Sequence, residues 1–259
     1  MTKPDTSSRL VLGEREVHVW RFTLDPSDER IARCETTLSA DEGRRAARFR
    51  GPGLRRRYVA GRGGLRSLLA CYTRARPETL AFSYGAHGKP SLVEAPPRFA
   101  FNLSHSHGLA LCAVSTVGTL GVDLEQIRPM EEDGRKLIGR FFSAVEQVEF
   151  LGLAEGERLG AFFRGWTRKE AFLKAVGTGL ATVLDSFDVT LGPSVAAALL
   201  RFENDPAAAA RWSLHDIDLG LGFAAALAVE SRGTPIDVVV RDFAPESRAG
   251  MTPAGLSEK

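Results

Sequence analysis

Residues 108–114 read GLALCAV and residues 222–229 read GFAAALAV, about 114 positions later in a chain of 259 residues. Both stretches begin at a glycine and continue as small and apolar residues, which is typical of a buried strand. Each follows a strand-like segment and a turn, and each part of the chain has its longer helical segments before its last strands. The recurrence predicts a duplicated α+β unit, with coincidence in an alanine-rich chain as the alternative.

The duplication divides the chain near residues 115–120. We therefore expect an N-terminal half over residues 10–118 and a C-terminal half over residues 119–243, with flexible ends at 1–9 and 244–259. Alternation of apolar residues predicts strands at 17–22, 79–84, 99–103, 109–114, 121–125, 187–191, 211–215, 223–229 and 236–240. Apolar stripes and capping residues predict helices at 39–50, 54–75, 136–152 and 158–176.

Positive charge is concentrated in one segment, although the net charge of the chain is only +2. Between residues 43 and 66 there are nine arginines and no acid: Arg44, Arg45, Arg48, Arg50, Arg55, Arg56, Arg57, Arg62 and Arg66. Such a cluster suits a nucleic acid, a phosphorylated small molecule or simply a solvated helix face. The rest of the chain is nearly neutral and has no nucleic-acid-binding motif, which favours the small molecule.

The cysteines and the apolar segments indicate the compartment. Cys34, Cys71 and Cys112 are odd in number and widely spaced, so they form neither a CxxC motif nor a disulfide framework. The first residues contain no apolar signal segment, and no apolar run reaches about 18 residues. The sequence therefore predicts a cytoplasmic protein without a membrane span, in a reducing compartment.

Two carboxylates share one face of the strand Gly121-Val122-Asp123-Leu124-Glu125. Residues two apart in a strand point the same way, with Cα atoms about 6.6 Å apart. Asp123 and Glu125 would repel each other unless a cation lies between them, and Mg²⁺ binds carboxylates together with phosphate oxygens. An ordinary exposed strand face is the alternative, because D-x-E is a common pattern.

The helix at 158–176 places a lysine in an apolar stripe. Phe162, Trp166, Leu173 and Val176 fall on one face, and Lys169 lies in the middle of it. An unpaired ammonium is costly to bury, so this stripe is expected to border a cleft that holds an anion. Glu170 and Lys174 lie beside the stripe, where an i,i+4 surface ion pair is the alternative.

The segment Phe101-Asn102-Leu103-Ser104-His105-Ser106-His107 has several possible uses. The two histidines would suit zinc, but no further Cys or His lies nearby to complete the site. A serine and histidine pair would suit nucleophilic catalysis, although adjacent residues rarely face each other in this way. Contact of the hydroxyl and imidazole groups with a phosphate is the third interpretation, and the spacing does not decide among them.

Taken together, these segments resemble the Sfp-type 4′-phosphopantetheinyl transferases in order and spacing, over roughly residues 17–230. The motifs are Gly88-Lys89-Pro90, Phe101 to Ser106, Gly121 to Glu125, Phe141-Phe142-Ser143 with Glu146, and Trp166 to Glu170 with Lys174. The resemblance implies a monomeric enzyme whose fold is a pseudo-dimer of two similar α+β halves. It also implies an active site in the cleft between these halves.

The resemblance assigns roles to individual residues. The family's magnesium ligands match Asp123, Glu125 and Glu170. The residues that contact coenzyme A phosphates match Lys169, Lys174, Ser104, His105, Lys89, Arg57 and, more loosely, Arg45. Because Arg55 and Arg56 precede Arg57, that assignment can shift by one position.

The reaction implied by the resemblance transfers the phosphopantetheine arm of coenzyme A to a serine of an acyl or peptidyl carrier protein. The carrier serine attacks the β-phosphate and 3′,5′-adenosine bisphosphate leaves. Glu170 is the expected base, with Glu146 as the second candidate, and Lys174 would stabilise the leaving phosphate. Polyketide or nonribosomal peptide synthases would supply the carriers. Positioning and charge neutralisation provide most of the catalysis in phosphoryl-type transfer.

The carrier is expected to dock on the C-terminal half, on residues 142–153 and the turn Gly177-Thr178-Gly179-Leu180. Gln147, Phe150 and Leu151 lie within one helical turn there, and burial of the two apolar residues in the core is the alternative. A coenzyme A or nucleotide-binding module without activity is a competing hypothesis. An arginine-rich nucleic-acid binder is another, but it would leave the carboxylates without a role.

Overall fold

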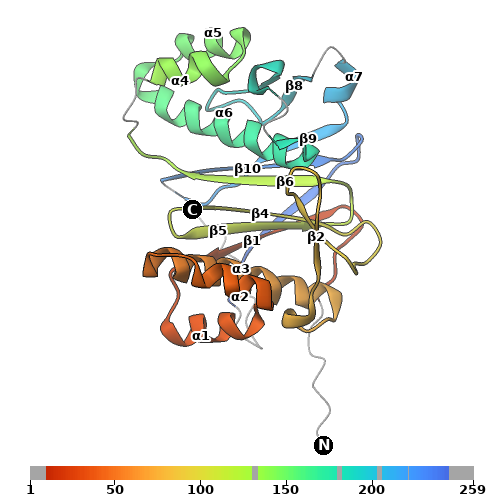
Figure 1. The fold of residues 1–259 in the computed structure, drawn as a ribbon. Coiled ribbons are helices and arrows are strands. Elements are labelled where there is room, and N and C mark those ends of the chain that lie inside the picture. The colour runs from red at the N-terminus through yellow and green to blue at the C-terminus, as the bar shows by residue number, and fades with distance from the viewer. Residues whose placement is uncertain (1–9, 130–133, 180–182, 203–205, 221, 245–259) are drawn as a thin grey trace, which may run out of the picture.

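The computed structural model describes residues 10–129, 134–179, 183–202, 206–220 and 222–244. This part of the chain is built of four layers, with two sheets face to face between two layers of helices (Figure 1). The mixed α+β class predicted from the sequence is confirmed. Apart from Ala244, the ends expected to be flexible lie outside the described residues.

The first sheet has the strand order β11-β1-β5-β4. Its strands are β1 (Glu16–Thr23), β4 (Ala100–Ser106), β5 (Leu109–Ser115) and β11 (Asp237–Asp242). Val19 pairs with Ala113 in the antiparallel neighbour β5 and with Val240 in the parallel neighbour β11. The last strand within the described residues therefore completes the sheet of the first half.

The second sheet repeats this arrangement, with the strand order β6-β10-β9. Its strands are β6 (Leu120–Gln126), β9 (Trp212–Asp216) and β10 (Phe223–Glu230). All neighbours in it are antiparallel, as they are in β1-β5-β4. The repeated sequences 108–114 and 222–229 form β5 and β10, the equivalent central strands, so the predicted duplication is confirmed. The exact boundary between the halves stays a prediction.

Each sheet is covered by a helix of 22 residues, α3 (Pro52–Thr73) on the first and α6 (Glu155–Val176) on the second. Leu65, Leu68 and Leu69 of α3 are fully buried in the first-half core. Shorter helices complete the outer layers: α1 (Asp28–Thr37), α2 (Ala40–Ala47), α4 (Gly134–Phe141) and α5 (Ala144–Gly152). A separate apolar cluster, which includes Val19, Leu111 and Leu227, fills the space between the sheets.

The prediction of a single helix at 136–152 is wrong, because the structure has two helices there, α4 and α5. Ser143 lies between them in an extended conformation and begins α5 with a capping box. Its Oγ accepts a hydrogen bond from the backbone N–H of Glu146, whose side chain accepts one from the N–H of Ser143. The cap satisfies donors that a helix start leaves unpaired, so it favours a new helix over continuation of the first.

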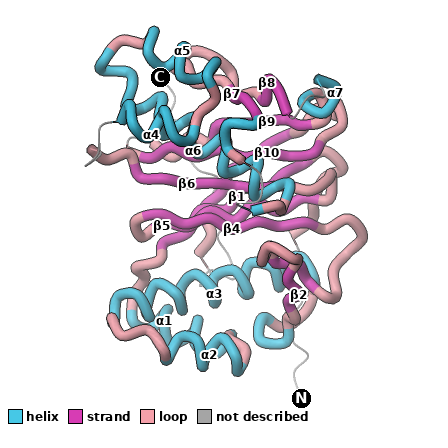
Figure 2. Tube along the Cα trace, turned by 45° about the horizontal axis from the view of Figure 1, so that its top comes forward, coloured by secondary structure: helices cyan, strands magenta, loops and turns pink. Residues whose placement is uncertain are grey.

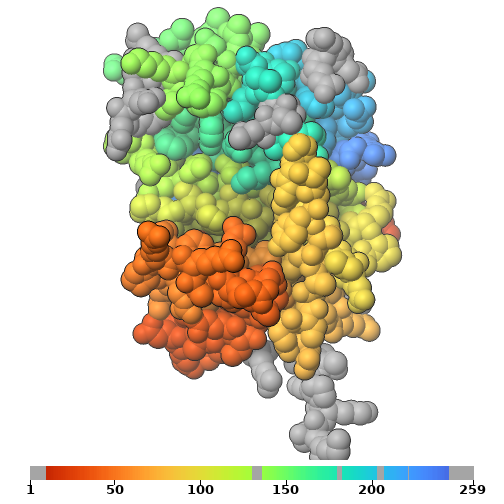
Figure 3. Space-filling model, in the orientation of Figure 1, coloured from red at the N-terminus to blue at the C-terminus, as the bar shows by residue number. Residues whose placement is uncertain are grey.

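A small hairpin of β2 (Phe82–Tyr84) and β3 (Pro90–Leu92) connects the two halves. Figure 2 shows it beside the end of α6, and in Figure 3 this part of the chain is a yellow column that runs from the first-half helices to the second half. Lys89, just before β3, donates hydrogen bonds to the carbonyl oxygens of Leu120 (2.9 Å) and Ala175 (2.8 Å). The hairpin is thus attached to both β6 and α6.

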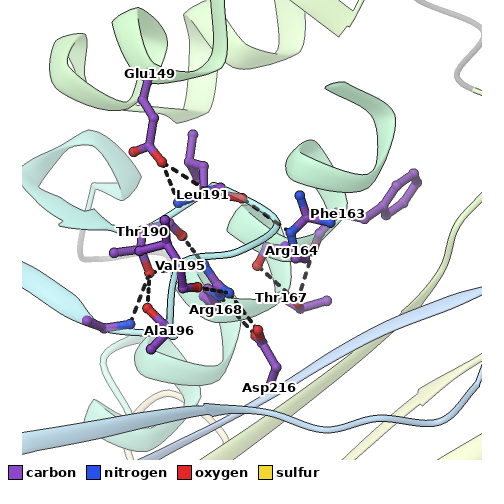
Figure 4. A network of polar contacts seen from close by, with 12 residues as sticks. Glu149, Phe163, Arg164, Thr167, Arg168, Thr190, Leu191, Val195, Ala196 and Asp216 are labelled. Carbon is purple, nitrogen blue, oxygen red and sulfur yellow. Dashed lines mark hydrogen bonds and ion pairs between the residues drawn. The ribbon is translucent and has the colours of Figure 1, made fainter. Parts of the chain in front are cut away.

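A buried arginine fixes α6 in the second half (Figure 4). The guanidinium of Arg168 donates to both carboxylate oxygens of Asp216 on β9, at 2.9 and 2.6 Å, and to the hydroxyl of Thr190 at 3.0 Å. Thr190 follows β7 (Phe187–Val189), which pairs with β8 (Leu199–Phe202); the short α7 (Pro206–Ala209) comes next. Among the described residues, no helix has both the length and the apolar character that a membrane crossing requires.

Candidate active site

The two halves meet where side chains of β4 contact β6. Asn102, Ser104 and Ser106 alternate along β4 and therefore point the same way. Asn102 accepts a hydrogen bond from the N–H of Val122 at 2.9 Å, and Ser106 accepts one from the N–H of Gln126 at 3.2 Å. Side chains of β4 thus occupy the hydrogen-bonding edge of β6 at this junction.

Asp123 lies at the centre of the junction, and only one of its carboxylate oxygens bonds to the part of the chain that the structure describes. Its Oδ1 accepts hydrogen bonds from Ser104 at 2.9 Å and from the ammonium of Lys174 at 2.6 Å. Its Oδ2 is buried and makes no hydrogen bond to any described residue. A buried carboxylate oxygen without a partner is costly, so this atom is suited to an additional cation.

Glu125 and Glu170 line the same cleft as Asp123, which has a volume of about 330 Å³. Burial raises the pKa of both glutamates above the usual range, and the negative charge of Asp123 raises each pKa further. Three like charges around a cleft would be stabilised by a divalent cation, and the oxygen donors suit Mg²⁺. Among the described residues, however, no three His, Cys, Asp or Glu side chains form a preassembled metal site.

Gly121 determines how closely Glu170 and Lys174 approach the strand. A Cβ atom at Gly121 would lie 2.2 Å from the carbonyl oxygen of Ala171 and 2.4 Å from the N atom of Ala175. A side chain at this position would therefore push α6 away from β6. The glycine allows the helix to lie directly on the strand, and this contact brings the helix carboxylate to those of the strand.

A second pocket, of about 470 Å³, adjoins the carboxylate cleft. Arg45, Arg57 and His105, to which the resemblance assigns phosphate contacts, line it, and His105 and Leu103 line both cavities. Arg57 forms a bidentate ion pair with Asp25, with N–O distances of 2.8 and 2.7 Å. We call this cavity the arginine pocket.

The neighbours of Arg57 have different contacts. Arg55 forms an ion pair with Glu35 at 2.7 Å, and Arg56 forms one with Asp28. Neither lines the arginine pocket. This placement favours Arg57 over the two adjacent arginines for contact with a ligand in that pocket.

Lys169 contradicts its expected role, because it is fully buried and does not line the cleft. Its ammonium contacts Glu146 at 2.7 Å and the carbonyl oxygens of Leu184 and Phe187 at 2.7 Å each. Phe162 and Leu173 of the stripe are buried in the core of the second half, whereas Trp166 lines the carboxylate cleft. A lysine is tolerated there because every donor finds an acceptor.

The structure also contradicts Glu146 as a candidate base. Glu146 is 1% exposed. One oxygen accepts the N–H of Val189, and the other accepts the N–H of Ser143 and contacts Lys169. With both oxygens occupied and no path to the cleft, Glu146 has no access to a substrate hydroxyl.

Lys89 is placed beside the cleft, but its ammonium is directed to main-chain carbonyls. Its contacts to Leu120 and Ala175 occupy two of its three N–H donors, and burial lowers the pKa of Lys89 to about 8. The expected phosphate contact of Lys89 stays a prediction that depends on the third donor. The structure gives it the role of joining the halves.

The residues expected to dock the carrier differ in their exposure to solvent. Phe150 is 2% exposed and belongs to the core, so the expectation that it forms a partner surface is wrong. Gln147 donates a hydrogen bond to the carbonyl oxygen of Phe142 at 2.8 Å. Leu151 is 51% exposed, and Val145 and Val148 are exposed on the same helix. Leu180 lies outside the described residues.

Three functional residues were missed by the sequence analysis. Asn102 and Ser106 join β4 to β6, and Asp25 holds Arg57. The alternation of polar side chains at 102, 104 and 106 was a usable signal, because it marks one face of a strand. The sequence around Asp25 gives no sign that this residue contacts Arg57, because the two residues are far apart along the chain.

Comparisons with known proteins agree with this geometry. A profile of the 4′-phosphopantetheinyl transferase superfamily matches residues 119–228. The 4′-phosphopantetheinyl transferase HetI of Nostoc sp. is 41% identical over 226 residues, which cover 86% of this chain and 92% of the relative. The 4′-phosphopantetheinyl transferase Sfp of Bacillus subtilis is 30% identical, with 64% of this chain and 71% of the relative covered.

Among solved structures, the holo-[acyl-carrier-protein] synthase of Thermotoga maritima is similar at 24% identity and a TM-score of 0.35, covering 44% of this chain and 63% of that one. Because the match to HetI covers 86% of this chain, it extends over both halves. The resemblance seen in the motifs is thereby confirmed: the chain belongs to the 4′-phosphopantetheinyl transferase superfamily.

Proposed function

We propose that this protein transfers the 4′-phosphopantetheine arm of coenzyme A to a serine of apo acyl or peptidyl carrier proteins. The observation that carries the proposal is Asp123 Oδ2, which has no partner among the described residues, in a cleft with Glu125 and Glu170 directly beside a pocket lined by arginines. A cation site next to an anion site is what a pyrophosphate-containing substrate requires.

The carboxylates of Asp123, Glu125 and Glu170 would hold Mg²⁺, whose charge would neutralise the pyrophosphate oxygens. Arg57, Arg45 and His105 would bind the 3′-phosphate and nearby groups of coenzyme A in the arginine pocket. Ser104 lies at the cleft with its hydroxyl already bonded to Asp123 and Lys174, so it orients both.

Glu170 is the proposed base. Its carboxylate lines the cleft, where it would accept a proton from the carrier serine, directly or through water. As the serine oxygen bonds to the β-phosphorus, the bond to 3′,5′-adenosine bisphosphate breaks. Lys174, whose ammonium lies in the cleft, would stabilise the charge on this leaving phosphate.

Mass spectrometry of apo carriers tests the proposal. A panel from polyketide, nonribosomal peptide and fatty-acid systems is incubated with coenzyme A, Mg²⁺ and the protein. We expect polyketide or nonribosomal peptide carriers to gain the mass of one phosphopantetheine arm, and a chelator to prevent it. Tight coenzyme A binding without any transfer would support the inactive binding module instead. The monomeric state and cytoplasmic location stay predictions.

Arg57 provides a test of anion recognition. We expect Arg57→Ala to weaken the binding of coenzyme A about ten- to a hundredfold, since a charge-assisted hydrogen bond contributes about 1.5–3 kcal/mol to affinity. The affinity for dephospho-coenzyme A, which lacks the 3′-phosphate, should fall much less. Calorimetry with both ligands measures the difference. Arg55→Ala is the matched control, because Arg55 is paired with Glu35 outside the pocket; equal losses for both ligands would argue against Arg57.

Leu151 provides a test of carrier docking. We propose that the exposed apolar face of α5, formed by Val145, Val148 and Leu151, contacts the carrier. Leu151→Asp should raise the KM for the carrier about tenfold, because one buried contact at an interface is commonly worth more than 1 kcal/mol. The KM for coenzyme A should not change. Steady-state kinetics give both constants.

The control for docking is Leu200→Asp, which places the same charge on an exposed leucine of β8. Equal effects on the carrier KM from Leu200 and Leu151 would count against a specific surface on α5. Phe150→Asp is expected to unfold the second half, because Phe150 belongs to its core.

A further inference from the structure

We propose that Asp25 is a positioning residue that sets which edge of the Arg57 guanidinium faces the arginine pocket, and thereby favours ligands with a 3′-phosphate. This inference rests on the proposed function. Asp25 lies two residues after the end of β1, and Arg57 lies near the beginning of α3. Arg57 lines the pocket and Asp25 does not, so Asp25 would act on a ligand only through Arg57.

The contact between the two residues uses one edge of the guanidinium. Nε of Arg57 donates to Oδ1 of Asp25 at 2.8 Å, and Nη2 donates to Oδ2 at 2.7 Å. A guanidinium has five N–H donors in one plane, so three remain, two on Nη1 and one on Nη2. Within the described residues these three donors have no acceptor. They form the end edge of the side chain, which can bind two oxygens of one phosphate.

The turn between β4 and β5 supports Asp25 from behind. The N–H of Leu24 donates to the carbonyl oxygen of Gly108 at 2.7 Å, and the N–H of Asp25 donates to the hydroxyl of Thr23 at 3.1 Å. A Cβ at Gly108 would lie only 2.5 Å from Oδ2 of Asp25. Gly108 also has a φ of +82°, which glycine adopts without strain. The turn therefore closes directly on the carboxylate and fixes the place of the ion pair.

The exposure of the pair argues against a role in stability. Both side chains are about half exposed, and exposed ion pairs contribute little to the free energy of unfolding. Hydrogen bonding to Arg57 lowers the pKa of Asp25, so the carboxylate is charged at neutral pH. The neighbouring pair of Arg55 and Glu35, outside the pocket, shows a single hydrogen bond. The bidentate geometry thus occurs at the arginine that faces the pocket.

A fixed guanidinium favours binding of a phosphate. An arginine that is free to rotate must be ordered when the ligand binds, and this ordering lowers affinity. Asp25 orders Arg57 beforehand and leaves its end edge available. The carboxylate would also repel a phosphate, but the guanidinium lies between the two anions and solvent screens the remaining repulsion. A ligand without the 3′-phosphate would not contact this edge and would be unaffected.

Calorimetry of Asp25→Asn tests the proposal. The amide keeps the size of the side chain but offers only one acceptor oxygen to the two donors of Arg57. We expect the affinity for coenzyme A to fall about three- to tenfold, the effect of ordering one long side chain. The affinity for dephospho-coenzyme A should not change. Glu35→Gln is the matched control, because Glu35 holds Arg55 outside the pocket, and it should bind both ligands like the unchanged protein.

A double-mutant cycle separates positioning from a general structural effect. In the Arg57→Ala background, Asp25→Asn should cause no further loss of coenzyme A affinity, because Asp25 acts only through Arg57. A thermal melt of each variant shows that the fold is retained.

Three results would overturn the proposal: an undiminished loss in the Arg57→Ala background, equal losses for both ligands, or tighter binding of coenzyme A by Asp25→Asn. The measurements need no carrier, so they are independent of transfer. Absence of phosphopantetheine transfer to any carrier, or of coenzyme A binding by the unchanged protein, would instead count against the proposed function.

Discussion

Glu170→Gln should lower kcat for phosphopantetheine transfer by at least about a hundredfold, the loss seen when one charge-stabilising group is removed from an active site. The substitution keeps the size of the side chain but removes both the proposed base and one negative charge from the cleft. Glu170 is half-buried beside the cleft, so the fold should be retained. Single-turnover transfer to a carrier and a thermal melt measure the two effects separately.

Glu157→Gln is the matched control, with the same chemical change on an exposed residue at the beginning of α6. This variant should have a kcat for transfer within about twofold of that of the unchanged protein, as expected for a surface substitution. Asp123→Ala and Glu125→Ala should also nearly abolish transfer. Asp123 is a less direct test, because its removal also frees Ser104 and Lys174. Near-normal turnover of Glu170→Gln would show that α6 does not supply the base.

Lys169→Met should destabilise the protein by about 3–5 kcal/mol, because it leaves Glu146 as a buried charge without its counterion. Urea unfolding measures the loss. The remaining folded protein should bind coenzyme A with unchanged affinity, because Lys169 does not line the cleft. A selective loss of coenzyme A affinity with normal stability would restore the role that the family resemblance implied.

A second variant and a change of pH identify the cause of this destabilisation. Glu146→Gln in the Lys169→Met background should recover part of the stability, since the amide still accepts the N–H of Val189 without a net charge. Burial already raises the pKa of Glu146, and loss of Lys169 should raise this pKa further. A carboxyl with a raised pKa in the folded state adds stability as the pH falls, so the penalty should shrink in acid. Lys136→Met, on an exposed residue of α4, is the control.

The sequence predicted those secondary-structure elements whose residues follow a local period. The strand at 121–125 and the repeated central strands follow from alternation and from the recurrence of a short pattern. The family motifs also led to Asp123, Glu125 and Glu170, which the structure brings to one cleft although they lie on two elements. The resemblance, rather than spacing along the chain, made that grouping possible.

Lys169 shows why other residues were misassigned. A helical projection places it in an apolar stripe, but it does not reveal what packs against the stripe. Its partners come from α5 and from residues 184 and 187, and only the tertiary fold brings these groups together. The tertiary fold also brings Lys89 to its carbonyl partners in the other half. Long side chains with distant partners leave no periodic signal.

The pairing of β11 with β1 has a consequence for the order in which the protein can mature on the ribosome. β1 is among the first segments to be synthesised, yet its parallel neighbour at residues 237–242 is among the last. Until then one edge of β1 has unpaired N–H and C=O groups, and Trp20 and Phe22 lack their contacts with Phe243. The strands of the second sheet are all synthesised before β11, so the second half can assemble its sheet while the sheet of the first half still lacks one strand.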